Sequence, residues 1–381
     1  MSTLRQAQDT APRQAQDAAL RQAQDAALGQ AQDAALGQAQ DAAPQQTQDP
    51  VRTAVIGVGA MGRHHARLYH NLPGSELVAV ADADEATGRA AAHRHGTRFY
   101  ADHRAMLDAE DVEAVSICVP TTLHLDVASE VIRRGIHVLV EKPIAASVSD
   151  GQAMIDQARA QGVTCAVGHI ERFNPAVIEL KRRLDAGELG RMFEIVARRK
   201  GPFPVRIRDV GVVVDLAAHD LDIMWYLTGS EVTRVYAETA QHVHKLQEDM
   251  VSGLLRFGNG TVGVLDIDWL TPTKIRELSV IGERGMFQVN YLTQDLFFFE
   301  NAQATGAWDT LSILRGVAEG RIVRHTVAKK EPLSTEIEAF LATVRGKEAS
   351  IVRGEDGLRA LRQALAIVQS GLEHRPITME V

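Results

Sequence analysis

The chain is poor in cysteine and contains no long apolar run. Its two cysteines, Cys118 and Cys165, lie inside apolar stretches, which indicates buried thiols in a reducing compartment. No Cys/His spacing of a zinc site occurs, so we expect no metal. No run of about 18 apolar residues is present, and the N-terminus lacks the apolar core of a secretory signal. We therefore expect a cytoplasmic protein with no membrane partner.

Positive charge is also in short supply. The net charge is -8 and the isoelectric point is near 6.0, which argues against nucleic acid as a partner because phosphate backbones would be repelled. The length of 381 residues is about right for two domains, and an apolar content of 45% allows a sizeable core.

The first fifty residues repeat an eight-residue unit, seen most clearly at 13–20, 21–28 and 29–36. A period of eight does not match two helical turns, so the single leucine of each unit forms no continuous stripe. Too little apolar surface is available to offset the entropy of ordering. We expect residues 1–50 to be a low-complexity tail, with a docking or oligomerising role as the alternative.

A dinucleotide-binding pattern begins at Thr53. The strand-like run 53–57 leads into Gly57-Val-Gly59-Ala60-Met61-Gly62 and then into a helical stretch at 63–71. The three glycines permit a tight turn, a close approach of the pyrophosphate and close packing of the helix on the strand. A second strand ends in Asp82, where a carboxylate would bind the adenosine ribose. The carboxylate of Asp82 favours NAD as the cofactor, whereas Arg63 leaves NADP as an alternative. Asp82 could instead serve only as the cap of the next helix.

Strands and helices continue to alternate as far as residue 167, which predicts a doubly wound parallel sheet. Ligands bind beyond the carboxyl ends of such strands. Glu141-Lys142-Pro143 directly follows the fifth strand, where Glu141 can accept bonds from ribose hydroxyls and Lys142 can reach a substrate oxygen. The complete set predicted for the cofactor is Gly57, Gly59, Ala60, Met61, Gly62, Arg63, Asp82, Pro120, Thr121, His124, Glu141 and Lys142.

A second group of chemistry-bearing residues lies on the predicted helix 213–227. Asp215, His219 and Asp222 share a stripe at helical spacing, away from the apolar one. A carboxylate one turn from an imidazole can orient it and stabilise its charged form. A solvated polar face is the simpler alternative.

Taken together, the glycine loop, the acidic end of the second strand, Glu-Lys-Pro and Asp-x-x-x-His resemble the glucose–fructose oxidoreductase/inositol dehydrogenase/MocA family over residues 51–381. The resemblance implies that Lys142, Asp215 and His219 are catalytic. His219 would take the hydroxyl proton and Lys142 would stabilise the developing alkoxide. It also implies that the Lys-Pro peptide bond is often cis and that no metal is needed. The protein would form a homodimer or homotetramer through one face of the second sheet.

A narrower resemblance to the UDP-N-acetylglucosamine 3-dehydrogenase branch rests on the segments 168–175 and 200–204. A cluster of basic residues at 198–208 independently suggests an anionic substrate, with a solvated loop or subunit contact as the alternative. The predicted substrate-binding residues are His169, Arg172, Asn174, Arg198, Lys200, Arg206 and Arg208.

The expected architecture is α/β, with a Rossmann domain at 51–170 and an α+β domain at 171–381. Seven strand-like runs between 192 and 299, a hairpin turn at Asn259-Gly260 and helices at 334–345 and 357–373 predict a large, mostly antiparallel sheet. We expect an NAD(P)-dependent dehydrogenase acting on C3 of a UDP-N-acetylhexosamine. An inositol or free-sugar dehydrogenase and a non-catalytic sugar-sensing protein remain alternatives.

Overall fold

The computed structural model describes residues 49–204, 210–301 and 319–379. The predicted tail at 1–50 therefore lies almost entirely outside the described residues. Pro50–Val381 forms one compact unit. Within the described residues, none of the helices is both long and apolar enough to cross a membrane.

The first half of this unit is built on a parallel six-stranded sheet in the order β3-β2-β1-β4-β5-β6. Its strands are short and apolar, as expected for a sheet that is covered on both faces. They are β1 (Val51–Ile56), β2 (Ser75–Ala81), β3 (Arg98–Tyr100), β4 (Ala114–Ile117), β5 (His137–Val140) and β6 (Cys165–Val167).

Helices cover the two faces of this sheet as two separate cores, because successive strand residues point to opposite sides. Val55 packs with α2 (Gly62–Asn71), α3 (Glu85–His95) and α10 (Pro332–Val344). Its neighbours Ala54 and Ile56 pack on the other face. The helices of that face are α4 (His103–Ala109), α5 (His124–Arg133), α6 (Val148–Gln161) and the start of α11 (Gly354–Glu373).

The second half is built on a nine-stranded sheet in the order β14-β13-β12-β11-β7-β10-β9-β8-β15. All pairings are antiparallel except that of β7 with β10. The strands are β7 (Met192–Pro202), β8 (Val232–Ala240), β9 (Met250–Phe257), β10 (Val262–Asp268), β11 (Leu270–Gly282), β12 (Gly285–Asn290), β13 (Asp295–Asn301), β14 (Glu319–His325) and β15 (Ile377–Thr378).

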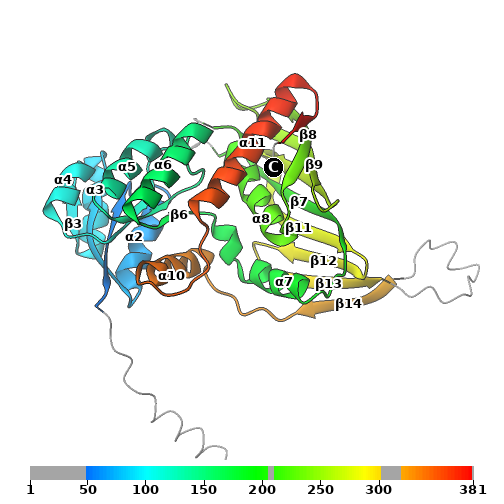
Figure 1. Cartoon of the computed structure of the whole chain (residues 1–381), viewed down its shortest axis with the longest axis horizontal. Coiled ribbons are helices and arrows are strands. Elements are labelled where there is room, and N and C mark those ends of the chain that lie inside the picture. The colour runs from blue at the N-terminus through cyan, green and yellow to red at the C-terminus, as the bar shows by residue number, and fades with distance from the viewer. Residues whose placement is uncertain (1–48, 205–209, 302–318, 380–381) are drawn as a thin grey trace, which may run out of the picture. The chain divides into compact units, whose positions relative to one another are not determined.

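One face of the nine-stranded sheet packs against helices α7 (Pro175–Asp185), α8 (Ala218–Thr228) and α11. The long helix α11 also contacts α6 and β6, so it joins the two halves (Figure 1). The predicted fold class is confirmed: a Rossmann sheet is followed by a large, mostly antiparallel one. Gly260 has φ of +91° between β9 and β10, as the predicted hairpin turn requires.

Candidate active site

The glycine loop between β1 and α2 has the geometry that the three glycines predict. Gly57 has φ of +83°, and a Cβ on Gly62 would lie 1.7 Å from the Gly57 carbonyl oxygen. A Cβ on Gly59, by contrast, would meet nothing within 4 Å. No side chain of the described residues caps the N-terminus of α2. The loop therefore leaves open space at the start of this helix, which suits a pyrophosphate.

Asp82 ties the end of β2 to this loop. Its carboxylate accepts the backbone N–H groups of Val58 and Asp84, each at 2.8 Å. The cap of helix α3 is Asp84, which accepts bonds from Ala86 and Thr87. Asp82 is therefore not the helix cap, and it remains a candidate for contact with a ribose.

Two adjoining cavities lie along the carboxyl edge of the parallel sheet, and both are lined by Cys118, Val119 and Pro120. The first, of about 420 Å³, is lined by Gly57, Gly59 and Asp82 among others. The second, of about 390 Å³, holds most of the remaining predicted residues: Ala60, Met61, Thr121, His124, Glu141, Lys142, Asp215 and His219. Gly62 does not line either cavity and serves as a packing position, while Arg63 is exposed beside the loop.

Lys142 and Asp215 form the polar centre of the second cavity. The Lys142 Nζ lies 2.7 Å from Asp215 Oδ1 and 2.8 Å from the Asp215 carbonyl oxygen. The Lys142–Pro143 bond is cis, in line with the resemblance. Asp215 lies in a π-helical turn, η3 (Val213–Ala217), which leads directly into α8. Single π turns inside helices are found frequently at functional sites.

His219 lies on the first turn of α8 and lines the same cavity. Burial, followed by the positive charges of Lys142 and Arg199, holds the pKa of His219 well below its ordinary value. The ring is therefore neutral near pH 7. Its Nδ1 is buried and has no hydrogen-bond partner among the described residues, which leaves Nε2 as the nitrogen that can meet a ligand.

Comparison with known proteins agrees with this geometry. Residues 51–169 match the model of the oxidoreductase family with an NAD-binding Rossmann fold, and 177–288 match the C-terminal domain of the same group. The UDP-N-acetylglucosamine 3-dehydrogenase of Acidithiobacillus ferrooxidans is 31% identical over 83% of this chain and 96% of its own length. The chain belongs to the Gfo/Idh/MocA oxidoreductase family.

Other relatives carry different substrate names. The scyllo-inositol 2-dehydrogenase (NAD+) of Bacillus subtilis is 28% identical over 87% of this chain and 97% of its own length. A solved structure of the Acidithiobacillus ferrooxidans 3-dehydrogenase matches with a TM-score of 0.75 and 30% identity, covering 85% of this chain and 98% of that one. This Gfo/Idh/MocA protein is an NAD(P)-dependent dehydrogenase, and its substrate is left open by these likenesses.

The two sides of the second cavity offer complementary chemistry to one hydroxyl group. Lys142 presents N–H donors that suit a developing alkoxide, and a neutral His219 presents a proton acceptor. Asp215, which was expected to orient both groups, bonds to Lys142 and not to His219. When bound, NAD would supply the hydride acceptor, and the residues around the glycine loop fit that cofactor.

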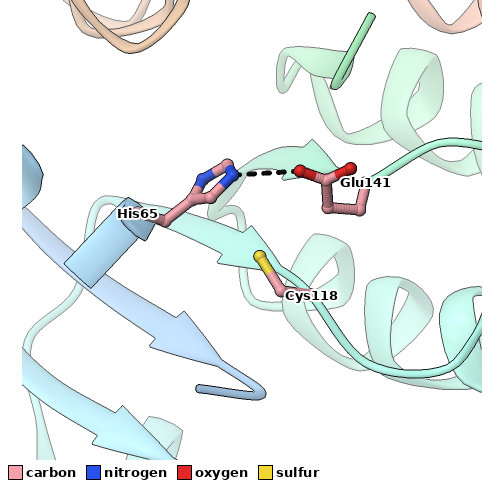
Figure 2. Close-up of side chains that lie close together, drawn as sticks. All are labelled: His65, Cys118 and Glu141. Atoms are coloured by element: carbon pink, nitrogen blue, oxygen red, sulfur yellow. Dashed lines mark hydrogen bonds and ion pairs between the residues drawn. The ribbon is translucent and has the colours of Figure 1, made fainter. Parts of the chain in front are cut away.

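A buried hydrogen-bond chain supports the turn that carries Lys142. His65 of α2 bonds Ser116 through Nδ1 at 2.9 Å. Its Nε2 bonds the Glu141 carboxylate at 3.1 Å (Figure 2). The second Glu141 oxygen accepts the Lys142 backbone N–H. Burial on its own would raise the pKa of Glu141, but the bond from His65 and the charge of Lys142 outweigh it and lower the pKa. Glu141 is therefore a charged anchor for the turn that carries Lys142.

Cys118 lies beside this pair, and one ligand atom of each of His65, Cys118 and Glu141 falls within a 4.8 Å cluster (Figure 2). The residue types suit a metal ion, but the hydrogen bonding of His65 and the protonation of Cys118 do not. Both nitrogens of His65 already have hydrogen-bond partners. Burial, followed by the charge of Glu141, raises the pKa of the Cys118 thiol well above its ordinary value. A metal would need the thiolate, so we assign this cluster to hydrogen bonding.

Of the predicted substrate-binding residues, the five that the structure describes do not line the cavity. Arg172 instead forms a bidentate pair with Asp222 and also bonds Asp356. Asn174 caps α7 and donates to the Tyr291 carbonyl oxygen. His169 is buried, does not line the cavity and packs edge to face against the ring of His219.

The basic cluster is divided between the faces of the nine-stranded sheet, because strand residues alternate. Arg198 and Lys200 lie on the face away from α8, where they pair with Asp266 and other acidic groups. Of the three described members, Arg199 is the one that points to α8, where it pairs with Asp220. Strand periodicity applied to β7 could have shown this division. Arg206 and Arg208 lie outside the described residues.

Sequence reasoning missed Arg276 and placed Arg199 only within the basic cluster. Arg199 is 4% exposed and forms a bidentate pair with Asp220 of α8, with Nε–Oδ2 at 2.6 Å. Arg276 stands opposite Arg199 on β11 and donates to the carbonyl oxygens of Lys200 and Ile275. Burial, followed by the charge of Arg199, lowers the pKa of Arg276 to about 10. Arg199 holds α8 on the sheet, and both arginines add positive charge near His219.

Proposed function

We propose that this chain oxidises a ring hydroxyl of a sugar-derived substrate with NAD, and that the substrate is a UDP-N-acetylhexosamine oxidised at C3. One observation carries the general reaction: Lys142 and His219, from different halves of the fold, line one cavity that adjoins the glycine-loop cavity. In this proposal Lys142, Asp215 and His219 are the catalytic residues, and His219 removes the hydroxyl proton.

The specific substrate rests on similarity. The 31% identity to a UDP-N-acetylglucosamine 3-dehydrogenase, over almost the whole of that protein, supports a nucleotide sugar. An inositol is the second candidate, because an inositol dehydrogenase is 28% identical over a similar span. The positions of Arg198 and Lys200 remove one argument for a diphosphate, since neither side chain faces the cavity.

The test is a panel of UDP-N-acetylhexosamines, free hexoses and inositols with NAD or NADP, followed by the absorbance of the reduced cofactor. We expect the highest kcat/KM with a UDP-N-acetylhexosamine and NAD, and a product that carries a ketone at C3. Competitive inhibition by UDP alone is expected as well. Turnover of inositols without inhibition by UDP would show that an inositol, and not a UDP-N-acetylhexosamine, is the substrate. Cofactor binding without turnover of any compound would favour a sugar-sensing role.

We also propose that the protein is a homodimer or homotetramer assembled through the face of the nine-stranded sheet that lies away from α8. A row of side chains crosses that face in register, from Leu254 through Val264 and Val196 to Ser279. Leu254 is 52% exposed. Light scattering should give a dimer or tetramer for the parent, and Leu254→Lys should shift it toward the monomer. A monomeric parent would contradict the assembly.

A further inference from the structure

The catalytic use of His219 requires that its two ring nitrogens have different roles. A neutral imidazole carries one proton, so Nε2 accepts from substrate only when the proton is on Nδ1. The tautomer is normally set by a hydrogen bond to the other nitrogen. Asp215 was expected to provide that bond, but its carboxylate bonds Lys142. Nδ1 of His219 is buried and lacks a partner among the described residues.

The group that faces His219 from the neighbouring element is His169. It follows β6 by two residues and is 1% exposed. The two rings are nearly perpendicular, with an interplanar angle of 86° and centroids 6.1 Å apart. Neither nitrogen of His169 has a hydrogen-bond partner within the described part of the chain. Two buried histidines thus meet edge to face, with three nitrogens in need of partners.

His169 is also uncharged at neutral pH. Burial lowers its pKa, Asp222 and Glu141 act in the opposite direction, and the charges of Arg172 and Lys142 add to the lowering. A neutral His169 has one accepting nitrogen and one N–H. It can therefore accept from the Nδ1–H of His219 after a rotation of either ring, or through one bridging water.

We propose that His169 is a positioning residue that holds the proton of His219 on Nδ1, so that Nε2 is free to accept the substrate proton. The inference rests on the proposed role of His219 as the base. His169 does not touch substrate in this scheme, because it does not line the cavity. It replaces the carboxylate that orients the base in many other enzymes.

Four variants separate hydrogen bonding from packing. His169→Phe keeps an aromatic ring against His219 and removes both nitrogens, whereas His169→Asn and His169→Gln each return an amide. His325→Phe is the matched control. His325 also packs on an aromatic ring and its Nε2 has no partner among the described residues, but it lies on β14. Activity is measured with UDP-N-acetylglucosamine and NAD, or with the best compound of the panel.

We expect His169→Phe to lower kcat/KM by about 10- to 100-fold, the range seen when a group that orients a functional histidine is removed. Asn or Gln should restore part of the loss, and His325→Phe should match the parent. An acceptor at Nδ1 favours the imidazolium form, so its removal should move the acidic limb of the kcat/KM profile to lower pH. A kcat/KM of His169→Phe equal to that of the parent would overturn the proposal. Equal losses of kcat/KM in the Phe, Asn and Gln variants, with no shift of the acidic limb of the pH profile, would overturn it as well.

A measurement on the protein without substrate makes the inference independent of turnover. Long-range proton–nitrogen spectra of histidine-labelled protein should show His219 in the Nδ1–H tautomer, with this preference lost in His169→Phe. A mixed tautomer in the parent would refute the role of His169. If His219→Asn keeps full activity, the assigned base is wrong. If His219→Asn is inactive while His169→Phe is normal, only the role of His169 fails.

Discussion

At the scale of single residues, Lys142 has the most constrained surroundings in the site. Its ammonium group is held between the carboxylate and the carbonyl oxygen of Asp215, and the side chain is only 15% exposed. Such a group cannot swing away from the cavity without leaving a largely buried carboxylate unpaired. The pairing fixes the donor that would meet the alkoxide, and it explains why Asp215 is not available to His219.

Replacing Lys142 by Met should therefore remove a transition-state interaction and leave the cofactor loop intact. We expect kcat to fall at least ~100-fold, the usual scale for a positioned acid–base group. Titration of the protein's fluorescence with NADH should still give binding close to that of the parent. Lys329→Met, at a lysine whose side chain is 61% exposed, is the control and should not change kcat. Near-parent turnover by Lys142→Met would remove the lysine from the reaction.

Glu336 of α10 gives a prediction about pH. Neither carboxyl oxygen has a partner among the described residues, and burial, with the charge of Glu141 adding, raises the pKa of Glu336 well above its ordinary value. The folded protein thus binds a proton that the unfolded chain has released. Stability must then fall as pH rises between the unfolded and the folded pKa, by up to about 1.4 kcal/mol per pH unit.

Glu336→Gln removes this titration, so the variant should gain unfolding free energy over the parent as pH rises from 5 to 8. Urea denaturation at several pH values measures the difference. Glu338→Gln, on the exposed side of the same helix, should show no comparable trend. A gap between Glu336→Gln and the parent that stays constant with pH would show that Glu336 is ionised in the folded protein.

At the scale of elements, the turn from β1 to α2 and the end of β2 act together. The carboxylate of Asp82 accepts the Val58 N–H and so holds the glycine loop against the second strand. The same carboxylate is the group that would bind a ribose 2′-hydroxyl and repel a 2′-phosphate. Its two roles can be separated by substitution, because Asn keeps an acceptor for Val58 but loses the charge.

Asp82→Ser should weaken the binding of NAD more than that of NADP. Asp82→Asn should have the same effect on binding while destabilising the glycine loop less. We expect a relative change of about tenfold, which corresponds to ~1.4 kcal/mol. Binding of both cofactors is measured by isothermal titration, and melting temperature reports the state of the loop. If the affinities for NAD and NADP fall in parallel in both variants, Asp82 acts on the loop alone.

The helices and strands that were predicted, and those that were not, show how far the sequence could predict the structure. Apolar runs and glycine spacing located β1, α2, β2 and the turn after β5 to within a few residues, because buried parallel strands leave little choice of side chain. Short or weakly patterned elements such as β3, α7 and β14 were not among the expected ones. Their existence depends on contacts with distant segments that no local pattern records.

The helix predicted at 213–227 shows the same limit within one element. Helical spacing places Asp215, His219 and Asp222 on one stripe, yet only the first two line the cavity. Asp222 is 3% exposed and pairs with Arg172. The π turn at Val213–Ala217 inserts a wider turn before α8, which changes the direction of Asp215 and brings its carboxylate to Lys142. Sequence periodicity has no signal for such an insertion.

At the scale of the whole compact unit, a buried ionic cluster joins the two sheets. Arg172, which follows the last strand of the parallel sheet, bonds Asp222 on α8 and Asp356 on α11. Asp356 also accepts from Arg359, whose guanidinium group lies 3.7 Å from the centre of the Trp225 ring. Since Asp222 is 3% exposed, its charge depends on Arg172 for compensation.

We therefore expect Arg172→Met to destabilise the whole unit and not one half of it. Loss of one partner from a buried pair costs about 3–5 kcal/mol, and the double variant Arg172→Met/Asp222→Asn should recover part of that cost because no buried charge is left alone. Arg159→Ala breaks an exposed pair with Glu355 and should cost less than ~1 kcal/mol. Denaturation followed by tryptophan fluorescence and by ellipticity should give coincident transitions if the sheets unfold together. Separate transitions in the parent, or a cost of Arg172→Met no larger than that of Arg159→Ala, would show that the cluster does not couple the two sheets.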